Sequence, residues 1–181
     1  VYNIAQLLYL LGQPPLERVS GKLYQETDMD PVRREKSGYN VEELGLGLAH
    51  FNGGATLDII ESWAIHLNAF EGSSIVGSKG GVRLEPFSYH SNMSDAPFDA
   101  QFNLTQAEFR WHALREDEDA YDSAQHHWIA ALQGRVPLLP TAEIALLTMQ
   151  ITEGIRLSNT LGREVTAGEI EEMSKSTALK L

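Results

Sequence analysis

The side chains that could bind a metal in this sequence are scattered, and each group has a plain structural interpretation. His126 and His127 are adjacent, so on a helix they point about 100° apart. Helical metal ligands favour spacings of three or four residues, and we interpret this pair as solvated or structural. Asp28-Met29-Asp30 lacks the downstream Gly and Glu of a calcium loop and is typical of a turn. We therefore expect no metal site.

Three other residues are candidates for contact with a small molecule. Tyr2 opens an apolar helical pattern, where a tyrosine usually packs or bonds at a rim, and a catalytic role would need a cleft and a partner that tunes its proton. Arg33, beside Arg34, could contact an anionic substrate or remain in a solvated loop. Trp63, like Trp111, either packs on a sheet face or lines a ligand cleft. The residues alone leave these alternatives open.

The motifs of cofactor and nucleophile chemistry are missing from the sequence. Gly45-Leu46-Gly47 comes nearest to a dinucleotide fingerprint, but it falls inside an expected strand and could not cradle a pyrophosphate. There is no P-loop, no Gly-x-Ser-x-Gly elbow and no His-Glu-x-x-His. The chain has no cysteine, which excludes disulfides, a thiolate nucleophile and Cys-ligated metals.

Composition predicts an acidic globular protein. The 181 residues, 43% of them hydrophobic, suit one domain or at most two very small ones. A net charge of -11 repels phosphate backbones and anionic lipids, so we expect neither nucleic acid nor a membrane as partner. No apolar run approaches the roughly 20 residues of a bilayer span, and the first residues lack the basic region of a signal peptide.

The clearest local pattern is a hairpin in the first half of the chain. Residues 44–51 and 55–67 both alternate between apolar and small or polar residues, and Asn52-Gly53 joins them. This pair favours a type I′ turn, because both residues tolerate positive φ. The Gly and Ala residues on one side of 44–51 indicate that this side meets a closely packed neighbour.

The remaining elements follow from periodicity and caps. An apolar helix over residues 2–11 ends at Gly12, a suitable left-handed cap. A polar surface loop is expected over residues 26–40. A capping box between Thr166 and Glu169 predicts a short final helix. Further strands are expected at residues 16–25, 73–76, 82–87 and 108–114, and further helices at residues 121–132 and from 141 to near 162. The predicted fold class is α+β, a mostly antiparallel open sheet with helices packed on one face.

In their order and spacing, several segments together resemble the glucose–fructose oxidoreductase/inositol dehydrogenase (Gfo/Idh/MocA) family. The segment from Val1 to Pro14 is similar to the one that follows Asp-x-Gly in that family, an apolar helix ending in Leu-Leu-Gly. The other similar segments are Val41–Leu44, Phe51–Leu57, Glu61–Trp63, Gly77–Leu84, His127–Pro137 and Ile151–Val165. They span nearly the whole chain.

The resemblance implies a second domain without its partner. Family members carry an N-terminal Rossmann domain and a C-terminal α+β domain, and they transfer hydride between NAD or NADP and a sugar, polyol or related compound. Residues 1–181 resemble the second domain alone, a single substrate-binding and oligomerisation domain, and Val1 suggests a piece of a longer chain. No cofactor is expected on this fragment, because the Rossmann domain that would hold it lies outside these residues.

The resemblance also assigns roles to individual residues. Tyr2 falls at the family's His/Tyr position and would be the catalytic acid or base, while the family's Lys and Asp would lie upstream. The candidate substrate-binding residues are Trp63 and Arg33. We expect a sugar-like substrate, a homo-oligomer formed through the sheet face, a cytoplasmic location, and no activity from the fragment alone. The alternative is a free-standing, non-catalytic dimerisation or binding module.

Overall fold

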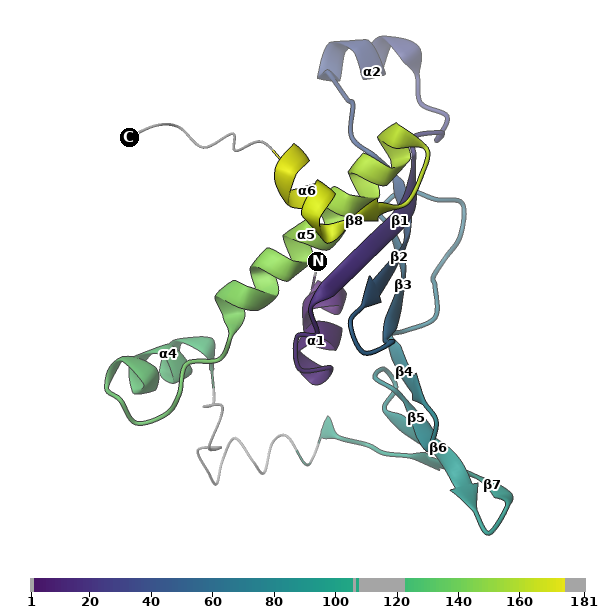
Figure 1. Cartoon of the computed structure of the whole chain (residues 1–181). Helices are drawn as coiled ribbons and strands as arrows, with labels where there is room; N and C mark the ends of the chain where they lie inside the picture. Colours follow the sequence, from purple (N-terminus) through teal and green to yellow (C-terminus); the bar gives the residue numbers. More distant parts are fainter. Residues whose placement is uncertain (1, 106, 108–122, 175–181) are drawn as a thin grey trace. The chain divides into compact units, whose positions relative to one another are not determined.

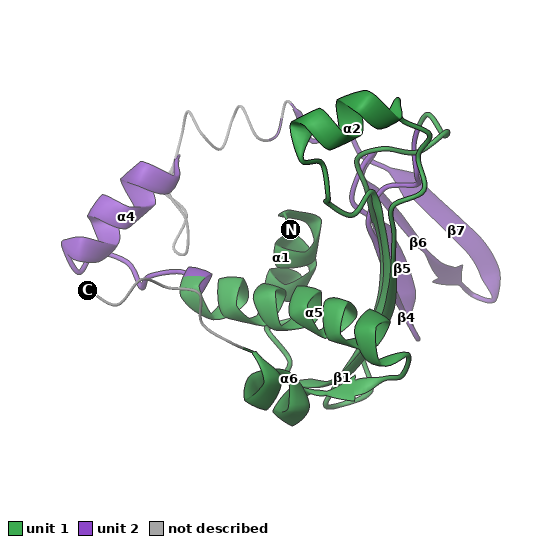
Figure 2. Cartoon of the chain, turned by 90° about the horizontal axis from the view of Figure 1, so that it is seen from above, with its two compact units in different colours: residues 1–68, 142–181 green, residues 69–141 purple. Residues whose placement is uncertain are grey.

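The computed structural model describes residues 2–105, 107 and 123–174, which form two compact units. Residues 1–68 and 142–181 make up unit 1, and residues 69–141 make up unit 2 (Figure 2). The expected strand at 108–114, with Trp111, lies outside the described residues. Each unit has its own sheet.

Unit 1 is built on a four-stranded antiparallel sheet, here called the first sheet. Its strands β1 (Leu16–Tyr24), β2 (Leu44–Phe51), β3 (Thr56–Ser62) and β8 (Val165–Thr166) lie in the order β3-β2-β1-β8. Helices α1 (Tyr2–Leu10) and α5 (Thr141–Leu161) lie on one side of it (Figures 1 and 2). The predicted α+β class, with helices on one face of an open antiparallel sheet, is confirmed.

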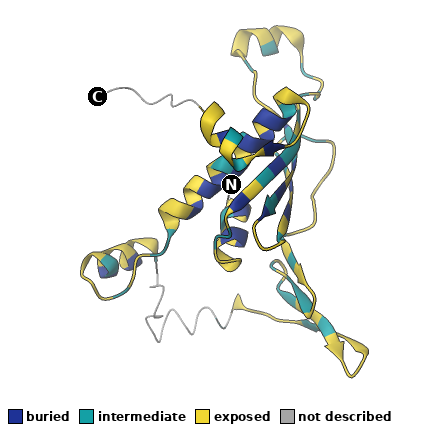
Figure 3. Cartoon of the chain, in the orientation of Figure 1, coloured by how far each residue is buried: buried dark blue, intermediate teal, exposed yellow. Residues whose placement is uncertain are grey.

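The core of unit 1 lies between the first sheet and α5. Val19 and Ile151 are fully buried, and Phe51 is nearly so. Figure 3 shows buried residues in dark blue along both the sheet and α5. Gly47 faces Ile155 of α5, because a Cβ built on this glycine would come 2.5 Å from the Ile155 Cδ1. The prediction that the glycine-rich side of β2 meets a closely packed neighbour is confirmed.

The edge of β1 has two kinds of cover. β8 pairs only with Arg18 and Val19. Farther along, the Gly21 N–H donates to Ser158 Oγ at 3.0 Å and the Leu23 N–H donates to Asn159 Oδ1 at 3.3 Å. Side chains of α5 thus take over the edge hydrogen bonds where the short strand ends, which protects an edge that would otherwise be open to pairing.

Unit 2 contains the second sheet, also four-stranded and antiparallel. Its order is β4-β5-β6-β7, and its strands are β4 (Ser74–Gly77), β5 (Gly80–Arg83), β6 (Ser88–Met93) and β7 (Ala96–Gln101). Helix α4 (Ala124–Leu132) starts after Ser123, whose side chain caps it by accepting from the His126 N–H. Of the strand predicted at 82–87, only residues 82 and 83 lie in a strand, β5, and residues 84–87 form a turn. The strands β6 and β7 were missed because polar residues such as Ser91 and Asp99 obscure their alternation.

The loop predicted at 26–40 was wrong in part, because it contains α2 (Pro31–Ser37). Asp30 caps this helix by accepting from the Arg33 N–H, and Gly38 ends it with a φ of 67°. Proline at the first helical position and glycine past the end are standard helix boundaries. The polar composition concealed them.

Two other expectations need correction. The strand predicted to reach residue 67 ends at Ser62, so Trp63 lies just beyond β3. At the hairpin, Gly53 and Gly54 both have φ of 90°, whereas Asn52 is not among the positive-φ residues. The hairpin is confirmed, but its turn is not the type I′ turn expected, because the glycines take the strained positions.

The helical ends of unit 1 agree with the sequence. Gly12 follows α1 with a φ of 74°. Helix α6 (Ala167–Met173) has the predicted capping box, in which Thr166 Oγ1 accepts from the Glu169 N–H and Glu169 accepts from the Thr166 N–H. Among the helices that the structure describes, none has the length and apolarity of a membrane span.

Candidate functional site

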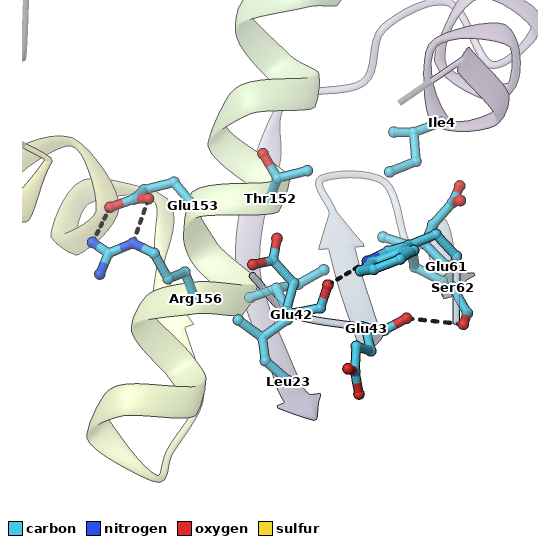
Figure 4. Close-up of a pocket in the computed structure, with 13 residues that line it drawn as sticks. Ile4, Leu23, Glu42, Glu43, Glu61, Ser62, Thr152, Glu153 and Arg156 are labelled. Atoms are coloured by element: carbon cyan, nitrogen blue, oxygen red, sulfur yellow. Dashed lines mark hydrogen bonds and ion pairs between the residues drawn. The ribbon is translucent and has the colours of Figure 1, made fainter. Parts of the chain in front are cut away.

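A cavity of about 480 Å³ opens in unit 1, on the side of the first sheet that faces α5 (Figure 4). Its floor is apolar, whereas its rim carries carboxylates, hydroxyls, one arginine and one indole. The lining residues are Ile4, Leu23, Glu42, Glu43, Gly45, Ile59, Glu61, Ser62, Trp63, Thr152, Glu153, Ile155 and Arg156. An apolar pocket with a few polar groups is the usual form of a small-molecule site.

The floor exists because β2 has a glycine there. A Cβ built on Gly45 would meet only the tip of Leu23, at 3.4 Å, and the Glu61 carbonyl at 3.9 Å. Two residues on, Gly47 is filled by Ile155. Alternate residues of a strand share a face, so the same strand both packs against α5 and leaves the cavity open.

Trp63 forms one wall. Its side chain is 62% exposed, and its indole Nε1–H donates to the Glu42 carbonyl at 2.7 Å. The ring of Tyr39 packs edge-on against it, with centroids 5.7 Å apart and planes at 70°. This solvent-exposed aromatic surface is suited to a ligand with one apolar face and several polar groups.

Behind Trp63 lies a buried carboxylate. Glu43 is 3% exposed, and it accepts hydrogen bonds from the Thr27 N–H at 2.7 Å and the Tyr39 hydroxyl at 2.8 Å. The Thr27 amide, more than any other group, lowers the pKa of Glu43, and this outweighs burial, which raises it. Burial and then the Glu43 hydrogen bond raise the pKa of Tyr39. The pair therefore holds an ionised carboxylate and a neutral phenol.

The opposite wall comes from α5. The Arg156 guanidinium donates from Nε to Glu153 Oε2 at 2.8 Å and pairs through Nη2 with Oε1 (Figure 4). This hydrogen bond lowers the pKa of Glu153 and raises that of Arg156. The only arginine among the lining residues is thus already paired with a carboxylate, so this wall is close to neutral.

The three predicted site residues are not brought together. Trp63 lines the cavity. Tyr2 is 90% exposed in the first turn of α1 and is not among the lining residues, although Ile4, one half-turn on, is. Arg33 lies exposed in α2, where its backbone N–H bonds to the Asp30 cap, and it too is absent from the lining.

Sequence reasoning missed Glu43, Tyr39, Thr152 and Arg156. Glu42 and Glu43 lie in the segment Val41–Leu44, which carries part of the family resemblance, but no periodicity distinguishes the buried carboxylate from its exposed neighbour. Thr152 and Arg156 lie four residues apart on α5, beside the apolar stripe of that helix. That spacing places them on one face of a helix, and this was the available signal.

The glycines of β2 do not form a dinucleotide-binding turn. Gly45 and Gly47 lie within β2, which pairs with β1 and β3, rather than before a helix. Nor do three His, Asp or Glu side chains of the described segments gather as metal ligands would. His127 is 6% exposed, and its Nε2 accepts from the Leu139 N–H at 3.2 Å, which agrees with its interpretation as a structural histidine.

Solved oxidoreductases share this fold. An aldose-aldose oxidoreductase from Caulobacter crescentus, complexed with glycerol, has a TM-score of 0.59 at 18% identity over 91% of this chain and 45% of its own. An oxidoreductase from Agrobacterium radiobacter with NAD+, L-tartaric acid and magnesium has a TM-score of 0.57 at 15% identity, over 92% and 47%. An NAD binding oxidoreductase from Klebsiella pneumoniae has a TM-score of 0.62 at 13% identity, over 91% and 48%.

These similarities concern the fold. The three proteins are oxidoreductases, and at 13 to 18% identity their likeness to this chain shows a shared fold. The fold that the sequence resemblance predicts is therefore confirmed. This chain spans about half the length of each of them. No protein-family model and no curated protein sequence matches the chain.

Proposed function

We propose that this chain is the substrate and oligomerisation domain of an NAD(P)-dependent oxidoreductase. The parent protein acts on the CH–OH group of a sugar or polyol, or on the related carbonyl. One observation carries this proposal: the chain has the fold of about half of several solved oxidoreductases, at TM-scores up to 0.62. The single-domain role for residues 1–181 and the cytoplasmic location belong to the same proposal.

The lining of the cavity suits a polyhydroxylated ligand. An indole wall such as Trp63 offers a flat apolar face, while the Thr152 hydroxyl and the Glu42 carboxylate at the rim offer partners to hydroxyl groups. One of the proteins with this fold holds glycerol, a small neutral polyol. Since Arg156 is paired with Glu153, the lining favours a neutral ligand over an anionic one.

In this proposal, the preceding domain and this chain have different roles. NAD or NADP would bind to a preceding Rossmann domain, because the glycines here lie inside a paired strand. Tyr2 would exchange a proton with the reacting oxygen of the substrate, and its 90% exposure leaves the phenol free to meet that domain. The isolated chain binds no cofactor and is inactive.

The experiment is to read the coding sequence upstream of Val1 over about 120 to 160 residues, the usual size of one domain, and to assay the complete protein. NAD+ and NADP+ are each offered with glycerol, D-glucose and myo-inositol, and reduced nicotinamide is followed by absorbance. A Gly-rich strand–helix unit upstream and turnover of a polyol are expected. A start codon a few residues before Val1 would overturn the enzyme assignment.

The second candidate is a free-standing dimerisation module. It rests on apolar side chains that the first proposal also uses: they lie on the side of the first sheet that faces away from α5, where Leu48 is 41% and Ile60 46% exposed. A cluster of this kind marks an interaction surface, and both candidates use it for a homo-oligomer. Sedimentation velocity of Ile60→Lys should show smaller particles than the unaltered chain, whereas Val32→Lys, on α2, should not. Unchanged assembly of Ile60→Lys would exclude the sheet face.

A further inference from the structure

Glu43 is a buried carboxylate for which the proposed reaction has no use. Among the described residues it is the only acidic side chain classed as buried. Burying a charge is costly unless its hydrogen bonds are satisfied, and here they come from the Thr27 amide and the Tyr39 hydroxyl. The hydrogen bonds that stabilise the buried carboxylate therefore also hold Thr27 and Tyr39 in place.

The residue joins segments that are far apart along the chain. Its carboxylate holds Thr27, which follows β1, and Tyr39, which follows α2. Its backbone carbonyl accepts from the Ser62 hydroxyl at 2.9 Å and from the Trp63 N–H at 3.2 Å. The start of β2 is thus bonded on one side to the α2 loop and on the other to the end of β3.

The same group of residues restrains the Trp63 side chain. Its indole N–H is held by the Glu42 carbonyl, and its ring is held by the edge contact with Tyr39. Tyr39 in turn has the Arg34 guanidinium 5.6 Å from its ring centroid. A tryptophan that is 62% exposed would otherwise sample several rotamers.

We infer that Glu43 and Tyr39 are positioning residues that hold Trp63 in one orientation at the wall of the cavity. The ring then presents a fixed face to the ligand, and the entropy of ordering it is lost on folding rather than on binding. The effect on substrate rests on the proposed function, whereas the effect on Trp63 itself does not.

The test makes Trp63 the only tryptophan, by Trp111→Phe and Trp128→Phe in the 181-residue chain. Acrylamide quenching and time-resolved anisotropy then report its mobility. Tyr39→Leu and Glu43→Gln should each raise the quenching constant by roughly twofold and add a fast anisotropy decay. Tyr39→Phe, which keeps the ring, should restore part of the restraint. Tyr9→Leu on α1 is the matched control and should change neither readout.

The readouts separate the inference from the function. If Trp63 is as restrained in Tyr39→Leu and Glu43→Gln as it is in the chain that keeps both residues, the inference is wrong. If Glu43→Gln does not fold, Tyr39→Leu alone decides. The complete protein is then assayed with whichever polyol of the panel it turns over. If the proposed function holds, Tyr39→Leu should change KM for that polyol by a larger factor than it changes kcat. A loosened Trp63 with an unchanged KM upholds the positioning role and removes Trp63 from the substrate site.

Discussion

Ile155 of α5 fills the space that Gly47 of β2 leaves by having no side chain. A Cβ on Gly47 would lie 2.5 Å from the Ile155 Cδ1 and 2.7 Å from its Cγ1, and a Cβ on Gly21 of the neighbouring strand would lie 2.8 Å from its Cγ2. Two adjacent strands therefore form a slot for one isoleucine. The close approach of α5 to the sheet depends on these glycines.

Gly47→Ala should destabilise unit 1. The added methyl group must displace Ile155, and overpacking of this kind costs about 1 to 3 kcal/mol. Gly45→Ala is the matched control, because the new Cβ would meet only the Leu23 tip at 3.4 Å. Urea unfolding followed by circular dichroism measures both. Equal unfolding free energies for the two variants would contradict the slot.

Ser158→Ala should also weaken unit 1. Ser158 is 4% exposed, and its hydroxyl accepts the Gly21 N–H at the edge of β1. Removing the acceptor leaves a half-buried donor without its partner, at a cost of about 1 kcal/mol. Thr160→Ala, at an exposed position of the same helix, should be nearly neutral. Hydrogen exchange at the Gly21 amide gives a second readout, and unchanged protection there would argue against the bond.

Glu169 makes stability depend on pH in the acid range. Its bonds, first to Arg163 and then to Thr166, lower its pKa from 4.5 to about 2. Since the folded-state pKa lies below the unfolded one, the stabilisation is complete above pH 4.5 and is lost as the pH falls towards 2. The difference in unfolding free energy between the unaltered chain and Glu169→Gln should shrink over that range.

The control for this titration is Glu172→Gln, which removes a charge from the same helix but leaves the Arg163 ion pair intact. Because this variant keeps the bonds from Glu169 to Arg163 and Thr166, any pH dependence that only Glu169→Gln removes is assigned to those bonds. A difference for Glu169→Gln that stays constant with pH would show that its carboxylate does not titrate with folding.

If Tyr2 has the proposed role of general acid or base, Tyr2→Phe should lower turnover of the complete protein by about 100-fold or more. Binding of the nicotinamide cofactor should change far less. Tyr9→Phe removes a second exposed hydroxyl from the same helix and should leave turnover intact. Steady-state kinetics and cofactor titration decide between them, and full activity of Tyr2→Phe would end the assignment.

Much of unit 1 could be predicted because its signals are local. The Gly12 cap, the Asn52-Gly53 hairpin and the Thr166–Glu169 capping box each depend on neighbouring residues alone. The two-residue strand β8 could not be predicted, since it exists only through pairing with Arg18 and Val19. The second sheet was half missed because its strands lack an apolar side long enough to give a pattern.

The candidate site was harder to predict because its contacts join residues that are far apart in the sequence. Trp63 was noticed as an aromatic residue, but its environment comes from contacts across distant parts of the chain, with Tyr39 and Glu42. Glu43 differs from Glu42 only in being buried, which no spacing in the sequence indicates. Tyr2 and Arg33 were selected from resemblance and charge, and neither lines the cavity.

Unit 2 interrupts unit 1, and this order has a consequence for synthesis. Val19 pairs with Val165, which is 146 residues later in the chain. At about 5 to 20 residues per second, a ribosome takes about 7 to 30 seconds to make that interval. During this time the apolar side of the sheet lacks α5, and the edge of β1 lacks β8. The nascent chain thus carries an exposed sheet while the whole of unit 2 is made, and chaperones have that interval in which to bind it.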